Sequence, residues 1–142
     1  MCGIVGLFLK DKSMEPELGT LLTDMLITMT DRGPDSAGIA IYSNKISNIG
    51  KLTLQSNKPD VDFLNLKSDL AVSLKGSVEI GVKSSHAVLK VKSDQLIEVR
   101  KILKCIRPDI RIISSGESLE IYKEVGLPKD VALRFNLKNM TG

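Results

Sequence analysis

The 142-residue sequence has no tryptophan, only 4% aromatic residues, one histidine and two cysteines. Cys2 and Cys105 stand too far apart for the paired spacing of a zinc or iron–sulfur site, and they form no disulfide framework. No stretch approaches 18 consecutive apolar residues, and no basic segment precedes the first apolar run, which argues against a transmembrane helix and a signal peptide. We therefore expect a cytoplasmic protein that holds neither a metal nor a cofactor.

Strong charge of either sign is also missing. Lys and Arg total 20 and Asp and Glu total 17, so the net charge is +3, and the two signs are interspersed along the chain. A nucleic-acid-binding surface requires clustered basic residues, so we expect neither a nucleic acid nor a membrane as partner. The length and the 42% hydrophobic content are typical of one globular domain with a sizeable core.

The N-terminus carries the most unusual feature, a cysteine at position 2. If Met1 is removed, Cys2 holds both a thiol, whose reference pKa is about 8.5, and an α-amine, whose reference pKa is about 7.7–8.0. Such a residue combines a nucleophile with its own general base. The alternative is a small apolar residue at the start of a strand. The continuous apolar run from Ile4 to Leu9 predicts a strand buried on both faces, and Gly3 and Gly6 would let other backbone approach closely.

Helical periodicity follows this run. Apolar residues recur at i, i+3, i+4, i+7, i+8 and i+11, which predicts a helix with these side chains in the core: Leu18, Leu21, Leu22, Met25, Leu26 and Met29. The helix must end before Pro34, because the residue before a proline disfavours the α conformation.

A loop at Arg32, Gly33, Pro34 and Asp35 then leads into a predicted strand, Gly38–Tyr42. One interpretation is a stabilising turn, since Pro presets φ, Gly relieves a tight bend and Asp bonds local N–H groups. The other places the loop beside Cys2, with Gly33 facing the terminal amine. The two interpretations are compatible.

The two motifs together, MCGIVGLF and about 30 residues later RGPDSAG, resemble the class II glutamine amidotransferase family of N-terminal-nucleophile hydrolases. The resemblance implies that Cys2 is the nucleophile, that Arg32, Gly33 and Asp35 support the site, and that glutamine is the substrate. A weaker likeness in Ser114–Gly126 is similar to the amidotransferase component of archaeal-type glutamate synthases and of N-methylglutamate-forming enzymes. It implies a downstream or partner synthase subunit that accepts the ammonia.

The resembling family also uses later segments, Gly-His-Thr-Arg, Asn-Gly and Gly-Asp, to bind glutamine and stabilise the oxyanion. This sequence has no Asn-Gly or Gly-Asp, and its one histidine, His86, does not precede that pattern. Two hypotheses therefore stay open, a working glutaminase domain and a non-catalytic N-terminal fragment or subunit that a continuation or partner chain completes. A third, an unrelated α+β binding module, does not account for the paired motifs. Unpaired strand edges would favour a homo-oligomer.

Beyond residue 70 the pattern predicts a small α+β subdomain, about Leu70 to Ser114. Alternating residues predict strands at Val78–Val82 and Ala87–Val91. A helix capped by Ser93 or Asp94 follows and ends before Pro108, and Ile110–Ile112 is another strand. We expect Cys105 to be a buried small hydrophobe on that helix and His86 to be an ordinary surface residue.

The end of the chain predicts a short helix at Ser118–Glu124, stopped by Gly126, and another beginning at Pro128. The predicted fold class is thus α+β, a partial N-terminal-nucleophile-hydrolase-like (αββα) domain with a small inserted α+β subdomain. Residues 1–69 would be the N-terminal part of the amidotransferase domain, and residues 70–142 the insertion and connecting helices.

Overall fold

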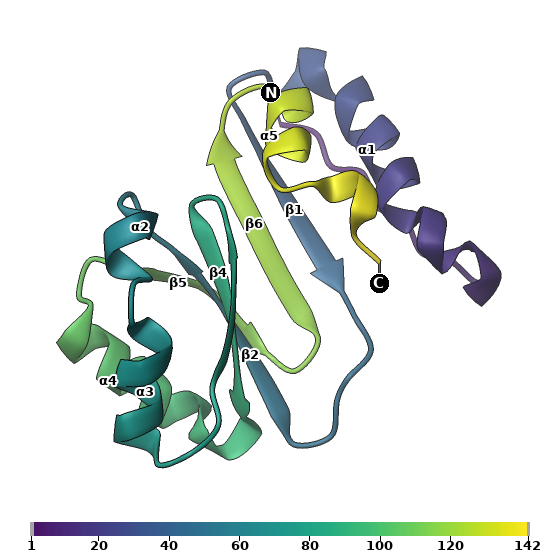
Figure 1. Ribbon diagram of the computed structural model, residues 1–142. Coiled ribbons are helices and arrows are strands. Elements are labelled where there is room, and N and C mark those ends of the chain that lie inside the picture. The colour runs from purple at the N-terminus through teal and green to yellow at the C-terminus, as the bar shows by residue number, and fades with distance from the viewer. Residues whose placement is uncertain (1, 142) are drawn as a thin grey trace. The chain divides into compact units, whose positions relative to one another are not determined.

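The computed structural model describes residues 2–141, whose contacts divide the chain into two compact units (Figure 1). The first unit holds the chain up to Ser43 and again from Tyr122, and the second is Asn44–Ile121. Both contain helices and strands, so the chain is α+β, whereas the N-terminal-nucleophile-hydrolase-like (αββα) fold stays a prediction. Residues 49–55 supply one of the two inner strands of the second unit's sheet.

The first unit is built on a two-stranded sheet of β1 and β6, whose arrows run in opposite directions in Figure 1. Its elements are η1 Lys12–Glu17, α1 Leu18–Thr28, η2 Thr30–Arg32, β1 Ser36–Tyr42, the part of β6 Leu119–Val125 from Tyr122 on, α5 Pro128–Arg134 and η4 Leu137–Asn139, while the first residues of β6 belong to the second unit. In its core the ring centroids of Tyr122 and Phe135 lie 5.2 Å apart, and Ile39 and Ile41 of β1 are also buried. Strand β1 and helix α5 confirm predicted elements.

Helix α1 packs through a different face from the predicted one. The six residues of the apolar stripe are only half-buried, whereas Gly19 and Thr23 on the neighbouring face are fully buried. A Cβ at Gly19 would collide with the carbonyl oxygen of Leu137 and lie 2.7 Å from that of Met140. The helix thus lies against backbone, where only a residue without a side chain fits. Periodicity identified the helix correctly but not its most buried face.

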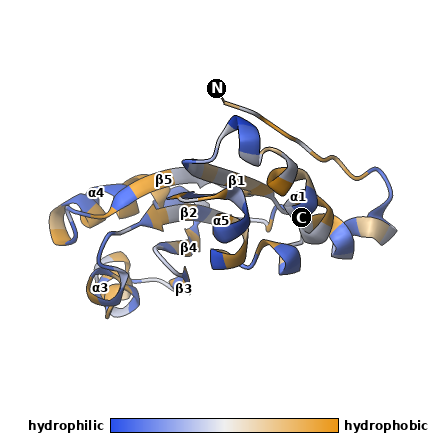
Figure 2. Ribbon diagram, turned by 90° about the horizontal axis from the view of Figure 1, so that it is seen from above, coloured by the Kyte–Doolittle hydropathy of each residue, from blue (hydrophilic) through white to orange (hydrophobic). Residues whose placement is uncertain are grey.

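The N-terminal segment corrects a second expectation. Residues 2–9 form no strand, and Ile4 and Phe8 are 95% and 85% exposed. Figure 2 shows this hydrophobic stretch as an extended segment. Val5, Leu7 and Leu9 are half-buried in alternation with the exposed residues, which is the period of a strand. Within residues 2–141 it pairs with no other strand. An apolar run becomes a buried strand only where a neighbour supplies hydrogen bonds, and this segment has none among the described residues.

The segment 119–125 is strand β6, so the predicted helix at Ser118–Glu124 is wrong. Seven residues are too few for periodicity to separate the two structures. The segment is a strand because it pairs with β1. Near the start of β6 the N–H of Ile121 also donates a hydrogen bond to Thr53 Oγ1 at 3.3 Å.

The second unit follows the order β–α–β–β–α–β of the ferredoxin-like motif. Its elements are β2 Ile49–Gln55, α2 Pro59–Asp62, α3 Leu66–Leu74, β3 Glu79–Lys83, β4 His86–Lys92, η3 Ser93–Gln95, α4 Leu96–Ile106 and β5 Arg111–Gly116. The antiparallel sheet has the order β3-β4-β2-β5. The predicted strands β3, β4 and β5 and the helix α4, which ends before Pro108, are confirmed.

Alternation along the strands gives this sheet one apolar face. Leu52 and Leu54 of β2 lie opposite Leu89 and Ala87 of β4, and all four are fully buried. The apolar residues of both helices cover them: Leu66, Leu70 and Leu74 of α3, and Val99 and Leu103 of α4. This cluster is the core of the second unit.

The other face of the same sheet is polar but still buried. Thr53 Oγ1 accepts a hydrogen bond from Ser114 Oγ at 2.9 Å, and Lys51 Nζ lies 2.8 Å from Glu120 Oε1. Lys51 is 5% exposed, so this ion pair is mostly shielded from solvent. Removing either Lys51 or Glu120 would leave the other as an uncompensated buried charge, which is strongly destabilising. The ion pair therefore favours the observed position of Glu120 over this face of the sheet.

Two single-residue expectations are corrected in this unit. His86 is fully buried rather than on the surface, because β4 lies between β2 and β3, and its Nδ1 lies 3.1 Å from Ser85 Oγ. Cys105, expected to be buried, is exposed and free, because α4 buries the positions of Val99 and Leu103 instead.

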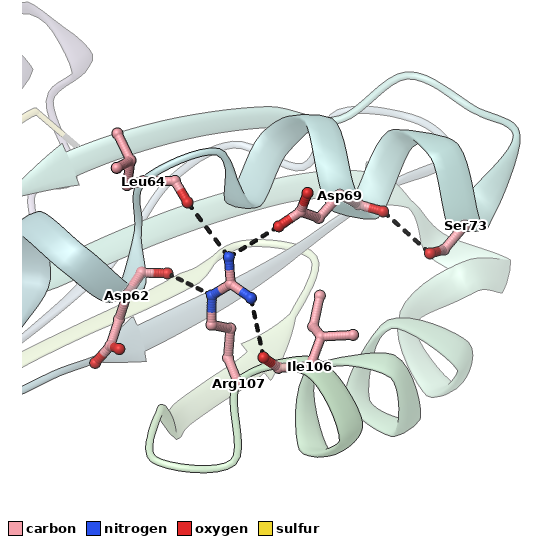
Figure 3. A network of polar contacts seen from close by, with 6 residues as sticks. All are labelled: Asp62, Leu64, Asp69, Ser73, Ile106 and Arg107. Atoms are coloured by element: carbon pink, nitrogen blue, oxygen red, sulfur yellow. Dashed lines mark hydrogen bonds and ion pairs between the residues drawn. The ribbon is translucent and has the colours of Figure 1, made fainter.

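Arg107 joins the end of α4 to the segment between α2 and α3 (Figure 3). Its Nε donates to the carbonyl of Asp62 at 3.2 Å, and one terminal nitrogen donates to the carbonyl of Leu64 at 3.4 Å and to the Asp69 carboxylate at 2.8 Å. The other terminal nitrogen donates to the carbonyl of Ile106 at 2.9 Å. The planar guanidinium thus donates to three backbone carbonyls and one carboxylate.

We predict that Arg107→Lys destabilises the second unit by about 1–2 kcal/mol, because an ammonium cannot serve these acceptors in one plane. The measurement is urea unfolding followed by circular dichroism. Arg100→Lys is the matched control, since Arg100 is an exposed residue of helix α4, which ends just before Arg107. Equal stability of the two variants would contradict a stabilising role for Arg107.

Candidate active site

Cys2 lies in the first unit, exposed and with a free thiol. The next residue, Gly3, lies against the segment that follows α1. A Cβ at Gly3 would collide with Met29 Cε and lie 3.4 Å from Arg32 Cβ and 3.5 Å from Arg32 Cδ. The structure therefore brings the residue beside Cys2 into contact with Arg32. A side chain at position 3 would require the end of the Met29 side chain to move, while the Arg32 atoms lie at ordinary contact distance.

The 3₁₀ turn η2 sets the position of Arg32. Arg32 N–H donates to the carbonyl of Met29 at 3.0 Å, and Gly33 N–H is shared between the carbonyls of Met29 and Thr30, at 3.2 Å each. These bonds tighten the end of the helix and satisfy carbonyls that an α-helix leaves free at its C-terminus. Pro34 then prevents the helix from continuing.

Asp35 is held from its other side. Its carbonyl accepts a hydrogen bond from Gly126 N–H at 2.9 Å, at the end of β6. The loop between α1 and β1 is therefore fixed at both ends by backbone bonds. This agrees with the stabilising-turn interpretation of RGPD.

The predicted site residues are only partly brought together. Arg32 meets the N-terminal segment, but within residues 2–141 no hydrogen bond or ion pair joins Arg32 to Asp35. A Cβ at Gly33 would meet no atom within 4 Å, so this position faces open space. Whether Gly33 faces a terminal amine stays a prediction, since Met1 lies outside the described residues. The arrangement offers an accessible thiol on a segment packed against a cationic residue.

Two neighbours of the site were assigned other roles from the sequence. Met29 was placed in the core stripe and Gly126 at a helix end, whereas Met29 lies under Gly3 and Gly126 holds Asp35. Because the helix must end before Pro34, its last turn lies next to the RGPD loop. The sequence could therefore have indicated that Met29, in that turn, is a neighbour of the site. No sequence signal pointed to Gly126.

Among the described residues no group of three or more His, Cys, Asp or Glu side chains is placed to hold a metal ion. In the same part of the chain, none of the helices has the length and apolar character needed to cross a bilayer.

No family model matches the chain. Over its full 142 residues the chain is 57% identical to the glutamine amidotransferase-like protein GlxB of Rhizobium meliloti, and it covers 47% of that protein. Aligned over 161 positions, it is 29% identical to a provisionally named glutamine amidotransferase of Methanothermobacter thermautotrophicus, of which it covers 49%. Both names contain glutamine amidotransferase. The chain spans about half the length of these relatives.

These similarities support the resemblance to glutamine amidotransferases that the N-terminal motifs predicted. They do not test the class II assignment, the N-terminal-nucleophile fold or the role of Cys2, which stay predictions. The same holds for the site-supporting residues Arg32, Gly33 and Asp35 and for the predicted division at residues 69 and 70.

Proposed function

We propose that this chain is the nucleophile-bearing part of a class II glutamine amidotransferase, with an αββα N-terminal-nucleophile-hydrolase fold completed by further chain. The observation that carries the proposal is the placement of Cys2, an exposed thiol whose neighbour Gly3 packs against Arg32 of the RGPD loop. The glutamine amidotransferase names of two relatives support it.

In the proposed reaction the Cys2 thiolate attacks the side-chain amide carbon of glutamine. The α-amine of Cys2 takes the thiol proton and returns it to the departing nitrogen, so that ammonia leaves and a thioester remains. Water then hydrolyses the thioester, which releases glutamate and restores the thiol. Arg32 and Asp35 would fix the geometry of the loop beside the nucleophile, and no cofactor takes part.

Apolar surface near the nucleophile supports the view that more chain completes the site. Ile4 and Phe8 are almost fully exposed, and the apolar stripe of α1 is half-buried. Burial of such surface is favourable at about 25 cal/mol per Å², so a covering segment would stabilise the unit. The relatives are about twice as long as this chain, which leaves room for that segment.

The alternative remains that this chain is a non-catalytic N-terminal fragment or subunit. The absence of Asn-Gly and Gly-Asp from the sequence favours it for the chain alone. In either case we propose that the ammonia is used by a glutamate-synthase-like enzyme in the cytoplasm. That enzyme would be a downstream or partner subunit. The likeness in Ser114–Gly126 motivates this choice.

Removal of Met1 is predicted to be required for activity, because a peptide bond turns the Cys2 amine into an amide that accepts no proton near neutral pH. The full-length protein is assayed for glutamate release from glutamine, and its intact mass is measured in the same preparation. We expect turnover only in protein that lacks Met1. Normal turnover with Met1 retained would exclude the α-amine from the mechanism, and no glutamate release at all would exclude the proposed activity.

A further inference from the structure

Strand β3 is the last strand of the four-stranded sheet, in which β5, β2, β4 and β3 follow one another (Figure 2). Four of its five residues are exposed, and Val82 is 54% exposed although it is apolar. Edge strands carry unpaired N–H and C=O groups and so are templates for another strand. This surface lies in the second unit and is independent of the proposed chemistry at Cys2.

The hairpin shows which backbone groups face outward. A two-residue turn, Ser84–Ser85, joins β3 to β4, and Lys83 lies directly opposite His86. In such a hairpin the residues next to the turn form a hydrogen-bonded pair, and the pattern alternates along the strand. The N–H and C=O of Ile80 and Val82 therefore point away from β4, toward a possible further strand.

The side chains of β3 complement a second copy of the same strand. Its sequence is Glu79-Ile80-Gly81-Val82-Lys83. If two copies pair antiparallel about Gly81, each Glu79 lies opposite the other copy's Lys83, and each Ile80 opposite the other copy's Val82. Within one chain Glu79 Oε2 already lies 3.7 Å from Lys90 Nζ, so Lys83 of the other copy would join an existing ion pair. Opposite charges directly across a strand pair stabilise it, and so do paired β-branched residues.

In this arrangement the two copies fit together on both faces of the joined sheet. Ile80 packs against the core that α3 and α4 cover, and Val82 shares its side of the strand. The second copy would cover the exposed part of Val82 and continue the apolar layer. On the other face a Cβ at Gly81 would meet no atom within 4 Å, so the two strands can meet there without obstruction.

We propose that the β3 edge is a homodimer interface, at which two copies of this chain join their four-stranded sheets into one about a two-fold axis at Gly81. The contact is isologous, because the same five residues serve both sides. Four outward backbone hydrogen bonds, two charge pairs and two apolar pairs would form.

Disulfide trapping tests the register directly in the full-length protein. Cys2 and Cys105 are replaced by serine, and Gly81→Cys is added. Directly opposed residues in a non-hydrogen-bonded pair lie about 4.5 Å apart at Cα, a distance that a disulfide spans. We expect covalent dimers on mild oxidation. Val72→Cys, at an exposed site on α3, is the matched control and should not form them.

Charge exchange tests the complementarity. In the Gly81→Cys background, Lys83→Glu places two carboxylates opposite each other at two points, so we expect dimer formation to fall by about tenfold or more. The exchange Glu79→Lys with Lys83→Glu should restore it. Lys104→Glu, on the outer face of α4, changes the net charge equally and should have no effect. No trapping at Gly81, trapping unaffected by Lys83→Glu, or no recovery in the exchanged variant would each overturn the proposal.

Discussion

Cys2→Ala is expected to abolish glutamine hydrolysis by the full-length protein, with a loss of at least about 10⁴-fold, because loss of the nucleophile removes the covalent route entirely. Use of free ammonia by the associated synthase should remain, since ammonia bypasses the thioester. The measurement compares product formation with glutamine and with an ammonium salt at equal concentration of enzyme.

The chain supplies a matched control for this prediction. Cys105 is also exposed and free but lies on α4 in the second unit. Cys105→Ala removes the same thiol chemistry from a site with no proposed role, and we expect unchanged glutaminase activity. If Cys2→Ala retains normal glutamine hydrolysis, or if Cys105→Ala loses it, the assignment of the nucleophile is wrong.

The 142-residue chain by itself is expected to release no measurable glutamate from glutamine. Cys2 and the RGPD loop are present, but no group that would bind the oxyanion or the α-carboxylate of glutamine has been identified in the sequence. Loss of one oxyanion donor typically costs about 10²–10³ in rate, and loss of the substrate contacts weakens binding as well. The exposed Ile4 and Phe8 show that the segment carrying Cys2 is not enclosed by the described residues.

The test is a coupled glutamate-release assay on this chain alone, and then with the product of any reading frame that follows it. Recovery of activity on addition of that product would support a site completed by further chain. Turnover by the chain alone at a rate normal for such enzymes would show that residues 1–142 hold the missing groups.

Local patterns predicted much of the second unit. Helix α4 and the strands β3, β4 and β5 all lie within a few residues of their predicted positions, because each buries one regular face against a common core. The same reasoning failed where the burial of a residue depends on which strands lie beside it. His86 looked like a surface residue from its neighbours, and only the position of β4 between two strands buries it.

For the site, the sequence by itself determined the chemistry that is available: a cysteine at position 2 and an RGPD loop that must end a helix at Pro34. The sequence could not determine which segments of the chain contact the RGPD loop. Gly3 lies against Arg32, and Gly126 N–H donates to the carbonyl of Asp35, and neither contact is visible in the local sequence pattern. Sequence patterns record which residues avoid water, whereas these contacts join segments far apart in the chain, and only the tertiary structure selects among the possible partners.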